Sequence, residues 1–262
     1  MTVCTITLEL DGAAPKGGRA HCCAAGGEIP AGWIAAEGPL PALKVGDRLA
    51  GEGAEFTVLS LGWLPGGGAT ASRRSCLLEP LADVAPGRYA CAAERKGYAL
   101  AWITLSDKGA AGKRTDESGP LIGEMAAGRL DLRLVQGFII PDEPSRLKAL
   151  LVELALGQGF DLVMTTGGTG VGPRDITPEA TLAVIEKRLP GYERAMTGAS
   201  LAKTPHGAIS RAVAGTLGEA LIVNMPGSPK AVAECLEPLL PTLRHTLEKL
   251  QGDPSDCAIL RK

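Results

Sequence analysis

The chain has 262 residues, of which 45% are hydrophobic, 21% charged and 3% aromatic, and its formal net charge is −2. This length is enough for one large domain or two small ones with a buried core. The near-neutral charge gives no electrostatic reason to expect binding to nucleic acid or to an anionic membrane, and the scarcity of aromatic residues argues against base stacking. No apolar run reaches the roughly 20 residues that span a membrane, and the N-terminal residues lack the pattern of a secretory signal. We therefore expect a cytoplasmic protein with no nucleic-acid or membrane partner.

The seven cysteines show no regular spacing, and their odd number argues against a framework of disulfide bonds. Cys22 and Cys23 follow His21, but adjacent cysteines are poorly spaced to share one tetrahedral metal ion. Reduced, partly buried thiols are therefore favoured over a metal site.

Residues 1–92 are predicted to form a small β-rich module. Polar and apolar residues alternate over 3–10, which predicts a strand, and residues 56–61 predict another. Glycine and proline clusters separate these segments, and no segment has a convincing helical pattern. These patterns assign the module no chemistry, so an assembly or docking role is favoured.

Residues 97–252 are predicted to form a second domain after a polar linker at 93–97. Apolar runs predict strands, at 98–105, 132–140, 160–165 and 220–224. Helical patterns lie between them; after residue 177, apolar residues at Leu182, Ile185 and Leu189 predict a helix, and an edge strand is expected to begin at Ser210. We therefore expect a three-layer α/β/α domain with a mainly parallel sheet. Right-handed connections place the loops that follow parallel strands along one edge of the sheet, where ligands bind.

A glycine-rich loop follows the strand that ends near residue 166. Four of the six residues at 167–172 are glycine, and the loop has neither the lysine of a Walker A motif nor the GxGxxG spacing of a dinucleotide site. Thr177 is a favourable helix N-cap, and Pro178 suits the first helical turn. Hydroxyls, bare amides, Arg174 and Asp175 together suit a phosphate and a metal ion better than a plain turn does.

The sequence TTGGTG at 165–170 and RDITPEAT at 174–181 resembles the signature of molybdopterin adenylyltransferases. That family includes the bacterial Mog-type proteins and the G domains of gephyrin and its plant counterpart. Four further motifs lie in the family's order along the chain: ITLSD at 103–107 and IPDE at 140–143 before this signature, and ISR at 209–211 and NMPGSPK at 224–230 after it. The resemblance covers about residues 97–250. Before it, residues 45–49 are similar to part of the MOSC type of β-barrel, which handles sulfur on molybdenum cofactor, but no cysteine can be placed in the context that those domains use.

The resemblance implies transfer of AMP from ATP to the terminal phosphate of molybdopterin, with release of pyrophosphate, in the biosynthesis of molybdenum or tungsten cofactor. It makes Asp142 and Asp175 the catalytic residues and the ligands of Mg²⁺. Other residues are implied in binding ATP or the pterin: Ser106, Asp107, Thr166, Gly167, Gly168, Thr169, Gly170, Ser210, Arg211, Pro226, Gly227 and Ser228. Arg174 and Lys230 are equally well interpreted as ligand contacts or as solvated surface charges.

The resemblance also implies a homotrimer and contact with the molybdenum insertase. Two alternatives stay open: a non-catalytic molybdopterin-binding or scaffolding protein of the same fold, and a different ATP-dependent nucleotidyltransferase. Retention of both aspartates together with the full glycine loop favours the adenylyltransferase.

Overall fold

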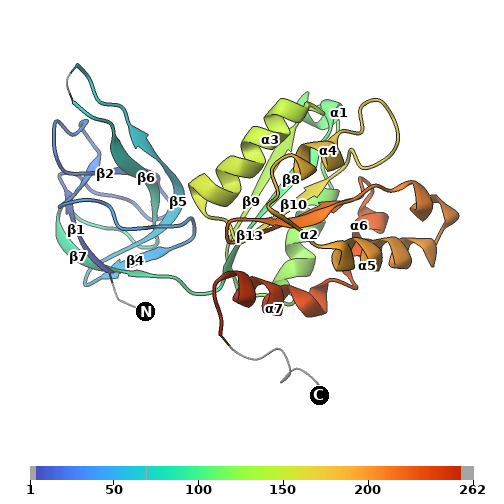
Figure 1. Ribbon diagram of the computed structural model, residues 1–262. Helices are drawn as coiled ribbons and strands as arrows, with labels where there is room; N and C mark the ends of the chain where they lie inside the picture. The colour runs from blue at the N-terminus through green and yellow to red at the C-terminus, as the bar shows by residue number, and fades with distance from the viewer. Residues whose placement is uncertain (1–3, 69, 255–262) are drawn as a thin grey trace. The chain divides into compact units, whose positions relative to one another are not determined.

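The computed structural model describes residues 4–68 and 70–254. They belong to two compact units, residues 1–97 and 98–262. Figure 1 labels helices and strands along the ribbon. Cys257 and most of the C-terminal tail lie outside the described residues. Residues 93 and 94 of the predicted linker still belong to the last strand of the first unit.

The first unit is a closed barrel of seven strands among its described residues, in the order β1-β3-β2-β6-β5-β4-β7. The strands are β1 (Cys4–Leu10), β2 (Ala20–Ala24), β3 (Ile34–Ala36), β4 (Arg48–Gly51), β5 (Ala54–Leu64), β6 (Arg73–Pro80) and β7 (Gly87–Glu94). The part of this unit that the structure describes contains no helix, which agrees with the predicted β-rich module.

The barrel core is aliphatic and rich in thiols. Ile6, Leu8 and Leu10 alternate along β1 and are all buried, so the predicted alternation is confirmed. Cys22 and Cys76 are direct partners across β2 and β6, and both are buried in this core. A hydrogen bond to Cys76, together with burial, raises the pKa of the Cys22 thiol. Cys22 is therefore a protonated core residue, and Cys76 packs beside it in the same core.

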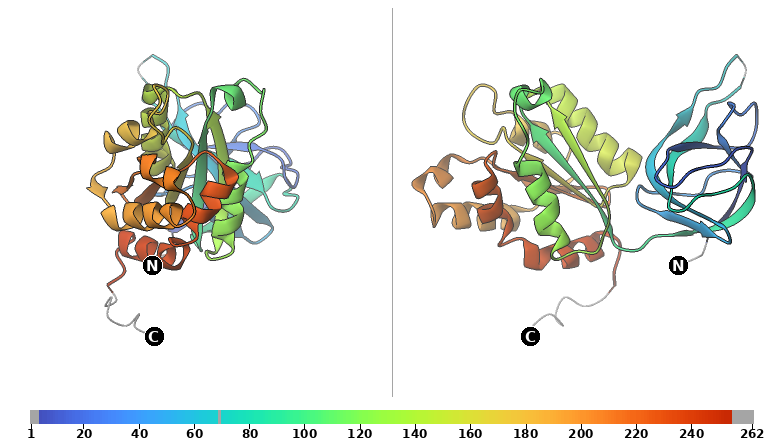
Figure 2. Two further views of the ribbon diagram at one scale, coloured as in Figure 1. Left: turned by 90° about the vertical axis from the view of Figure 1, so that its right-hand side faces the viewer. Right: turned by 180° about the vertical axis from the view of Figure 1, so that it is seen from behind.

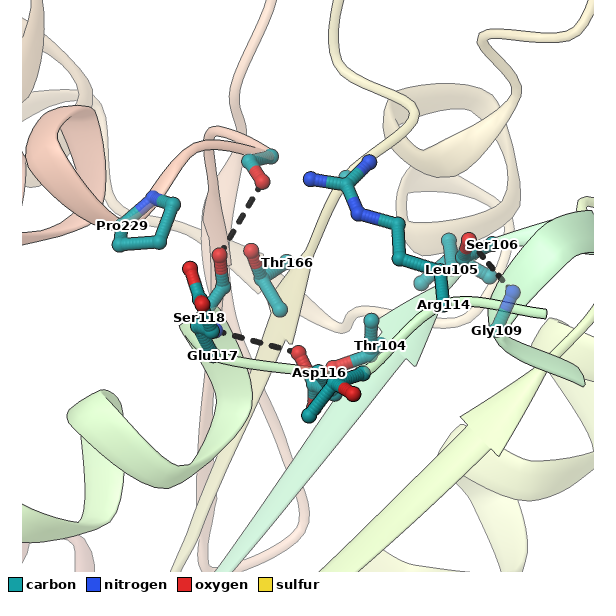
Figure 3. A pocket seen from close by; sticks show the side chains of 13 residues that line it. Thr104, Leu105, Ser106, Gly109, Arg114, Asp116, Glu117, Ser118, Thr166 and Pro229 are labelled. Atoms are coloured by element: carbon teal, nitrogen blue, oxygen red, sulfur yellow. Dashed lines mark hydrogen bonds between the residues drawn. The ribbon is translucent and has the colours of Figure 1, made fainter. Parts of the chain in front are cut away.

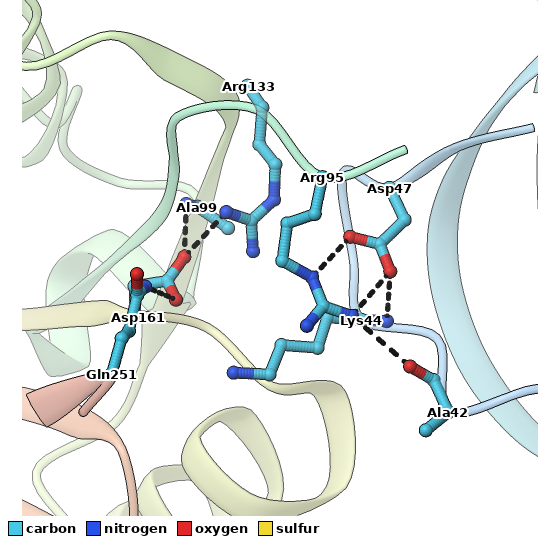
Figure 4. Close-up of polar contacts among 8 residues, drawn as sticks. All are labelled: Ala42, Lys44, Asp47, Arg95, Ala99, Arg133, Asp161 and Gln251. Atoms are coloured by element: carbon cyan, nitrogen blue, oxygen red, sulfur yellow. Dashed lines mark hydrogen bonds and ion pairs between the residues drawn. The ribbon is translucent and has the colours of Figure 1, made fainter. Parts of the chain in front are cut away.

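One carboxylate is buried in the barrel unit beside an arginine (Figure 4). Asp47 is 2% exposed and accepts hydrogen bonds from the Lys44 amide at 2.8 Å and from Nε and one terminal nitrogen of Arg95, both at 2.7 Å. Arg95 also donates to the carbonyl of Ala42 at 3.2 Å. The arginine thus compensates the buried negative charge.

The second unit contains a six-stranded sheet in the order β11-β12-β13-β10-β8-β9. The strands are β8 (Tyr98–Leu105), β9 (Leu132–Ile140), β10 (Leu162–Thr166), β11 (Lys187–Arg188), β12 (Ala214–Leu217) and β13 (Ala220–Met225). The strands β13, β10, β8 and β9 pair in parallel, whereas β12 and β11 pair antiparallel at one edge. The sheet is therefore mixed, and the prediction of a mainly parallel sheet holds only for its four parallel strands.

Helices follow most of the strands (Figures 1 and 2). They are α1 (Asp107–Ala110), α2 (Ser118–Ala127), α3 (Pro144–Val152) with a π-helical continuation at Glu153–Gln158, α4 (Thr177–Leu182), α5 (Pro190–Leu201), a 3₁₀ turn at Pro205–Ile209, α6 (Pro229–Leu236) and α7 (Leu240–Leu250). Residues of α2, α6 and α7 form one core with alternate residues of β8, β10 and β13. Among the described residues, no helix combines the length and the apolar character needed to cross a membrane. The three-layer arrangement stays a prediction.

A second carboxylate is buried at the start of β10 (Figure 4). Asp161 is 1% exposed and accepts hydrogen bonds from the Ala99 amide at 2.7 Å and the Gln251 side chain at 2.9 Å. It also forms an ion pair with Arg133 at 2.8 Å, in which both side chains are nearly inaccessible. This network ties four segments of the α/β unit together.

Two sequence predictions for this unit are wrong in their boundaries. The apolar spacing that continues past Leu182 predicted a longer helix, but α4 ends at Leu182. The edge strand was expected to begin at Ser210, but β12 begins at Ala214. After Leu182 the chain leaves the helix and forms the short strand β11 at Lys187–Arg188.

Candidate active site

The polar motifs of the second unit converge at the carboxyl ends of its parallel strands. In the register of the sheet, Thr166 of β10 lies between Thr104 of β8 and Met225 of β13. Leu105 pairs with Ile140, so the loop after β9 lies beside the loop after β8. Loops that follow parallel strands therefore meet at one edge, as the sequence predicted.

The loop after β10 has a backbone that only glycine adopts readily. Gly167 and Gly168 have φ values of 98° and 62°. A Cβ atom on Gly168 would lie 2.5 Å from Oγ1 of Thr177. That hydroxyl donates to the carbonyl of Gly167 at 2.8 Å. The predicted N-cap role of Thr177 is thus wrong: α4 begins with Thr177, its N-cap position is Ile176, and Thr177 fastens the loop instead.

Three consecutive amides of this loop have no internal acceptor. The Gly167 amide is already paired, since it donates to the Met225 carbonyl at 3.2 Å, and the ligand contact implied for Gly167 stays a prediction. The amides of Gly168, Thr169 and Gly170 donate to no other residue that the structure describes. Successive unpaired amides form a concave site that attracts anions.

Buried polar side chains support the loop from below. Asn224 is fully buried and donates to the hydroxyls of Thr165 at 3.0 Å and Thr181 at 2.9 Å. This network joins β13, β10 and α4. Because these buried polar side chains are hydrogen-bonded to one another, the segments on both sides of the loop are held in place.

Arg211 braces the loop from the side. Its guanidinium donates to the carbonyls of Gly170 at 2.7 Å and Asp175 at 2.8 Å, and it pairs with Glu179. Its own amide donates to the Thr169 carbonyl at 2.9 Å. The ligand contact that the family resemblance implied for Arg211 stays a prediction, because its charge is engaged by the loop and by Glu179.

Asp142 lies against Asp107 and the glycine loop. The amide of Asp107 donates to Oδ2 of Asp142 at 3.2 Å, and the amide of Asp142 donates to Oδ1 of Asp107 at 3.2 Å. Oδ1 of Asp142 lies 3.5 Å from where a Cβ on Gly168 would be. Burial raises the pKa of Asp142 above its ordinary value, and the charges of Asp107 and Asp175 act in the same direction.

Arg174 is engaged by Asp107 rather than solvated alone. One of its terminal nitrogens donates to both carboxylate oxygens of Asp107 at 2.6 Å. This bond lowers the pKa of Asp107. Both side chains are more than half exposed, so the pair lies at the mouth of the site and is open to exchange with a charged ligand.

Asp175 lies on the other flank of the loop. Its Oδ2 accepts the Gly172 amide at 2.7 Å, and a Cβ on Gly170 would lie 2.8 Å from the same atom. Oδ1 of Asp175 and Oδ1 of Asp142 accept no hydrogen bond from the described residues. Two carboxylates with one unshared oxygen each suit a hard cation such as Mg²⁺. No cluster of three or more such side chains occurs among the residues described, so phosphate oxygens would have to complete the coordination.

A cavity of about 120 Å³ is lined by Gly167 and by the residues labelled in Figure 3. Asp116 forms one wall: it accepts the Thr104 hydroxyl at 2.7 Å and the amides of Ser118 and Gly119 at 3.1 Å each. The Ser118 hydroxyl donates to the Gly227 carbonyl at 3.1 Å. Sequence reasoning missed these residues, although an aspartate two residues before Ser-Gly-Pro is a recognisable start signal for a helix.

The remaining predicted residues lie around this edge with local roles. Ser106 accepts the Gly109 amide at 3.0 Å, and Ser228 caps α6 by accepting the Ala231 amide at 3.3 Å. The Pro226 carbonyl accepts the hydroxyl of Thr166 at 2.7 Å. Ser210 lines a separate cavity of about 220 Å³ together with Thr169 and Pro226.

Lys230 is exposed and pairs with no described residue. The barrel residue His21 stacks on Trp33 at a centroid distance of 4.5 Å.

Known proteins resemble the second unit. The chain is 38% identical to the molybdopterin adenylyltransferase of Helicobacter pylori strain J99, over 58% of this chain and 86% of that protein. It is 36% identical to the molybdenum cofactor synthesis protein cinnamon of Drosophila melanogaster over 61% of this chain, a match that spans 26% of that protein. Among solved structures, the molybdopterin biosynthesis enzyme MoaB of Thermus thermophilus has 42% identity and a TM-score of 0.55, and it covers 61% of this chain and 99% of that one.

The family described as probable molybdopterin binding domain matches residues 101–245. The match contains the glycine loop and both aspartates and includes no residue of the barrel unit. It spans more than half of the 262-residue chain, and the chain therefore belongs to this family.

Proposed function

We propose that this chain is a molybdopterin adenylyltransferase, which transfers AMP from ATP to the terminal phosphate of molybdopterin and releases pyrophosphate in cofactor biosynthesis. The observation that carries the proposal is the row of three unpaired amides at Gly168, Thr169 and Gly170, flanked by the carboxylates of Asp142 and Asp175. The curated relatives that bear this activity in their names support it.

The reaction needs alignment and charge neutralisation more than it needs a protein nucleophile. An oxygen of the acceptor phosphate attacks the α-phosphorus of ATP, and the bond to the pyrophosphate oxygen breaks. The unpaired amides would hold phosphate oxygens and fix the α-phosphorus for this attack. Because Thr177, Asn224 and Arg211 hold the loop from three directions, the amides are oriented before the nucleotide binds.

Asp142 and Asp175 would hold Mg²⁺, which would neutralise charge on the phosphates. Burial raises the pKa of Asp142 although the Asp107 amide and the charge of Arg174 oppose the shift, and a divalent cation would stabilise the charged form further. Arg174 is placed to leave Asp107 for a nucleotide phosphate, since the exposed ion pair is weak.

Several finer features complete the proposal. We place the protein in the cytoplasm as a homotrimer that contacts the molybdenum insertase, with helices forming a layer on each face of the sheet. One bifunctional molybdenum cofactor biosynthesis protein from Chlorobaculum tepidum is 37% identical over 58% of this chain. A relative that combines two functions in one chain supports the proposed contact between this protein and the insertase.

The test is pyrophosphate release from ATP and Mg²⁺ by the full chain, with and without molybdopterin under anaerobic conditions. We expect release only when all three are present, with formation of adenylyl-molybdopterin. If molybdopterin binds but is not converted, the chain is a binding or scaffolding protein and not an adenylyltransferase. Pyrophosphate release that does not depend on molybdopterin would indicate a nucleotidyltransferase with another acceptor.

A further inference from the structure

The cavity beside Asp116 contains a cationic side chain that the loop and the two aspartates do not use. Arg114 lines this cavity and forms no hydrogen bond or ion pair with any residue that the structure describes. Figure 3 shows its side chain extending over the cavity, on the side opposite Ser118 and Pro229. An arginine without a carboxylate partner, directed over a hollow, is available to an anionic ligand.

The acidic neighbour does not compete for this arginine. One oxygen of Asp116 accepts the Thr104 hydroxyl at 2.7 Å, and the other accepts two amides at 3.1 Å. Glu117 is exposed on the rim. The negative charge of Asp116 is thus stabilised by its own donors, and Arg114 stays free of it.

The size and position of the cavity restrict what it can hold. Its volume of about 120 Å³ is enough for a small polar group of several atoms, such as a phosphate. The lining includes hydroxyls of Thr104, Ser118 and Thr166 and the start of α6 at Pro229. The positive end of that helix favours an anion there.

Gly167 separates the cavity from the unpaired amides. It lines the cavity, while the next residue, Gly168, begins the row of amides beside Asp142. None of Gly168, Thr169, Gly170, Asp142 and Asp175 lines the cavity. A phosphate bound there would therefore lie next to the loop and leave the unpaired amides and both carboxylates to the nucleotide.

We propose that the cavity lined by Thr104, Arg114, Ser118 and Thr166 binds the phosphate monoester of the acceptor substrate, with Arg114 as its charged ligand. This rests on the proposed function for the identity of the acceptor, molybdopterin. The assignment makes Arg114 a specificity-determining residue of this chain: it reads the phosphate of the acceptor and leaves ATP to the glycine loop.

The experiment is anaerobic calorimetric titration of the full-length protein with molybdopterin, with dephosphorylated molybdopterin, and separately with ATP and Mg²⁺. Arg114→Gln should weaken molybdopterin binding by about tenfold, the usual range for a charge-assisted contact, and Arg114→Lys by less. Dephosphorylated molybdopterin should bind the wild type and Arg114→Gln equally weakly. ATP binding should stay unchanged in both variants.

Arg129→Gln is the matched control, because Arg129 is an exposed arginine beyond the far end of α2 and does not line the cavity. It removes the same charge and should leave all three affinities unchanged. Unaltered molybdopterin affinity in Arg114→Gln overturns the inference, as does a loss confined to ATP or an equal loss for the dephosphorylated pterin. Since binding is read without turnover, a wild type that binds molybdopterin but releases no pyrophosphate would refute the enzyme and still test Arg114.

Discussion

The two units bury different kinds of side chain. Among the described residues, the barrel buries two polar side chains, Asp47 and Ser75, whereas the α/β unit buries ten. Most of those ten are threonines in or around the glycine loop, with Asn224 beneath it. Buried polar groups are tolerated only when hydrogen-bonded. The difference teaches that the α/β unit uses buried hydrogen bonds to fix the geometry of a site, while the barrel interior is almost entirely apolar.

The largest expected effect concerns the two buried carboxylates. Asp161→Ala should destabilise the α/β unit by about 3–5 kcal/mol, because it leaves Arg133 charged and inaccessible. Asp47→Ala should cost the barrel about 1–3 kcal/mol, because Arg95 is 36% exposed and can be solvated. Urea unfolding followed by hydrogen–deuterium exchange of each unit measures both values. Equal losses would mean that the units do not differ in how they bury charge.

Asp142→Asn should have the next largest effect, and it distinguishes a catalytic role of this carboxylate from a structural one. We expect adenylyl transfer to fall at least about 100-fold, the effect of losing several kcal/mol of metal-assisted stabilisation. Burial raises the pKa of Asp142, so the fold favours the neutral form, and Asn imitates that form. The Tm at neutral pH should therefore stay equal or rise, and any gain should vanish in acid once Asp142 is protonated. A lower Tm would show that the carboxylate is structural.

Gly168→Ala should lower adenylyl transfer by about 10- to 100-fold by displacing the amides. Its Cβ would lie 2.5 Å from Oγ1 of Thr177, and its φ is +62°. Gly191→Ala in α5 is the control, since a Cβ there meets nothing within 4 Å, and it should raise stability by roughly 0.5 kcal/mol. Steady-state rates with ATP and molybdopterin report the difference. Full activity in Gly168→Ala would remove the loop backbone from the mechanism.

The smallest functional effect is expected from the thiols of the barrel. Burial raises the pKa of Cys23 and Cys91, and the bond to Cys76 with burial raises that of Cys22. Cys4 is exposed and should react with iodoacetamide at least about tenfold faster than these three, since the thiolate is the reactive form. Mass spectrometry of the native protein gives the order, and activity should not change. Rapid labelling of Cys22 would show that the barrel opens readily.

The sequence predicts the core strands of the α/β unit well because each is a continuous apolar run. The expected strands at 98–105 and 132–140 coincide with β8 and β9. It fails where tertiary hydrogen bonds decide the structure: Thr177 has the chemistry of a cap, yet the nearby Gly167 carbonyl takes its hydroxyl. The antiparallel edge was not predictable, because β11 contains only two residues.

Much of the site could be proposed from motifs, since Asp142, Asp175 and the loop do lie together. The sequence could not show that the Gly167 amide is already used, because its acceptor, Met225, lies on a different strand. It also could not show that Arg114 lacks a partner. Such facts depend on which groups of distant segments meet, and local patterns do not encode them.

The hydrogen bond between Gln251 and Asp161 has a practical consequence for anyone shortening this chain. Gln251 lies just past the last helix, where a truncation would look harmless. A chain ending at residue 250 would lack the Gln251 side chain, which is one of the donors that stabilise the buried Asp161 carboxylate at the start of β10. Expression trials should therefore keep the chain at least through Gln251.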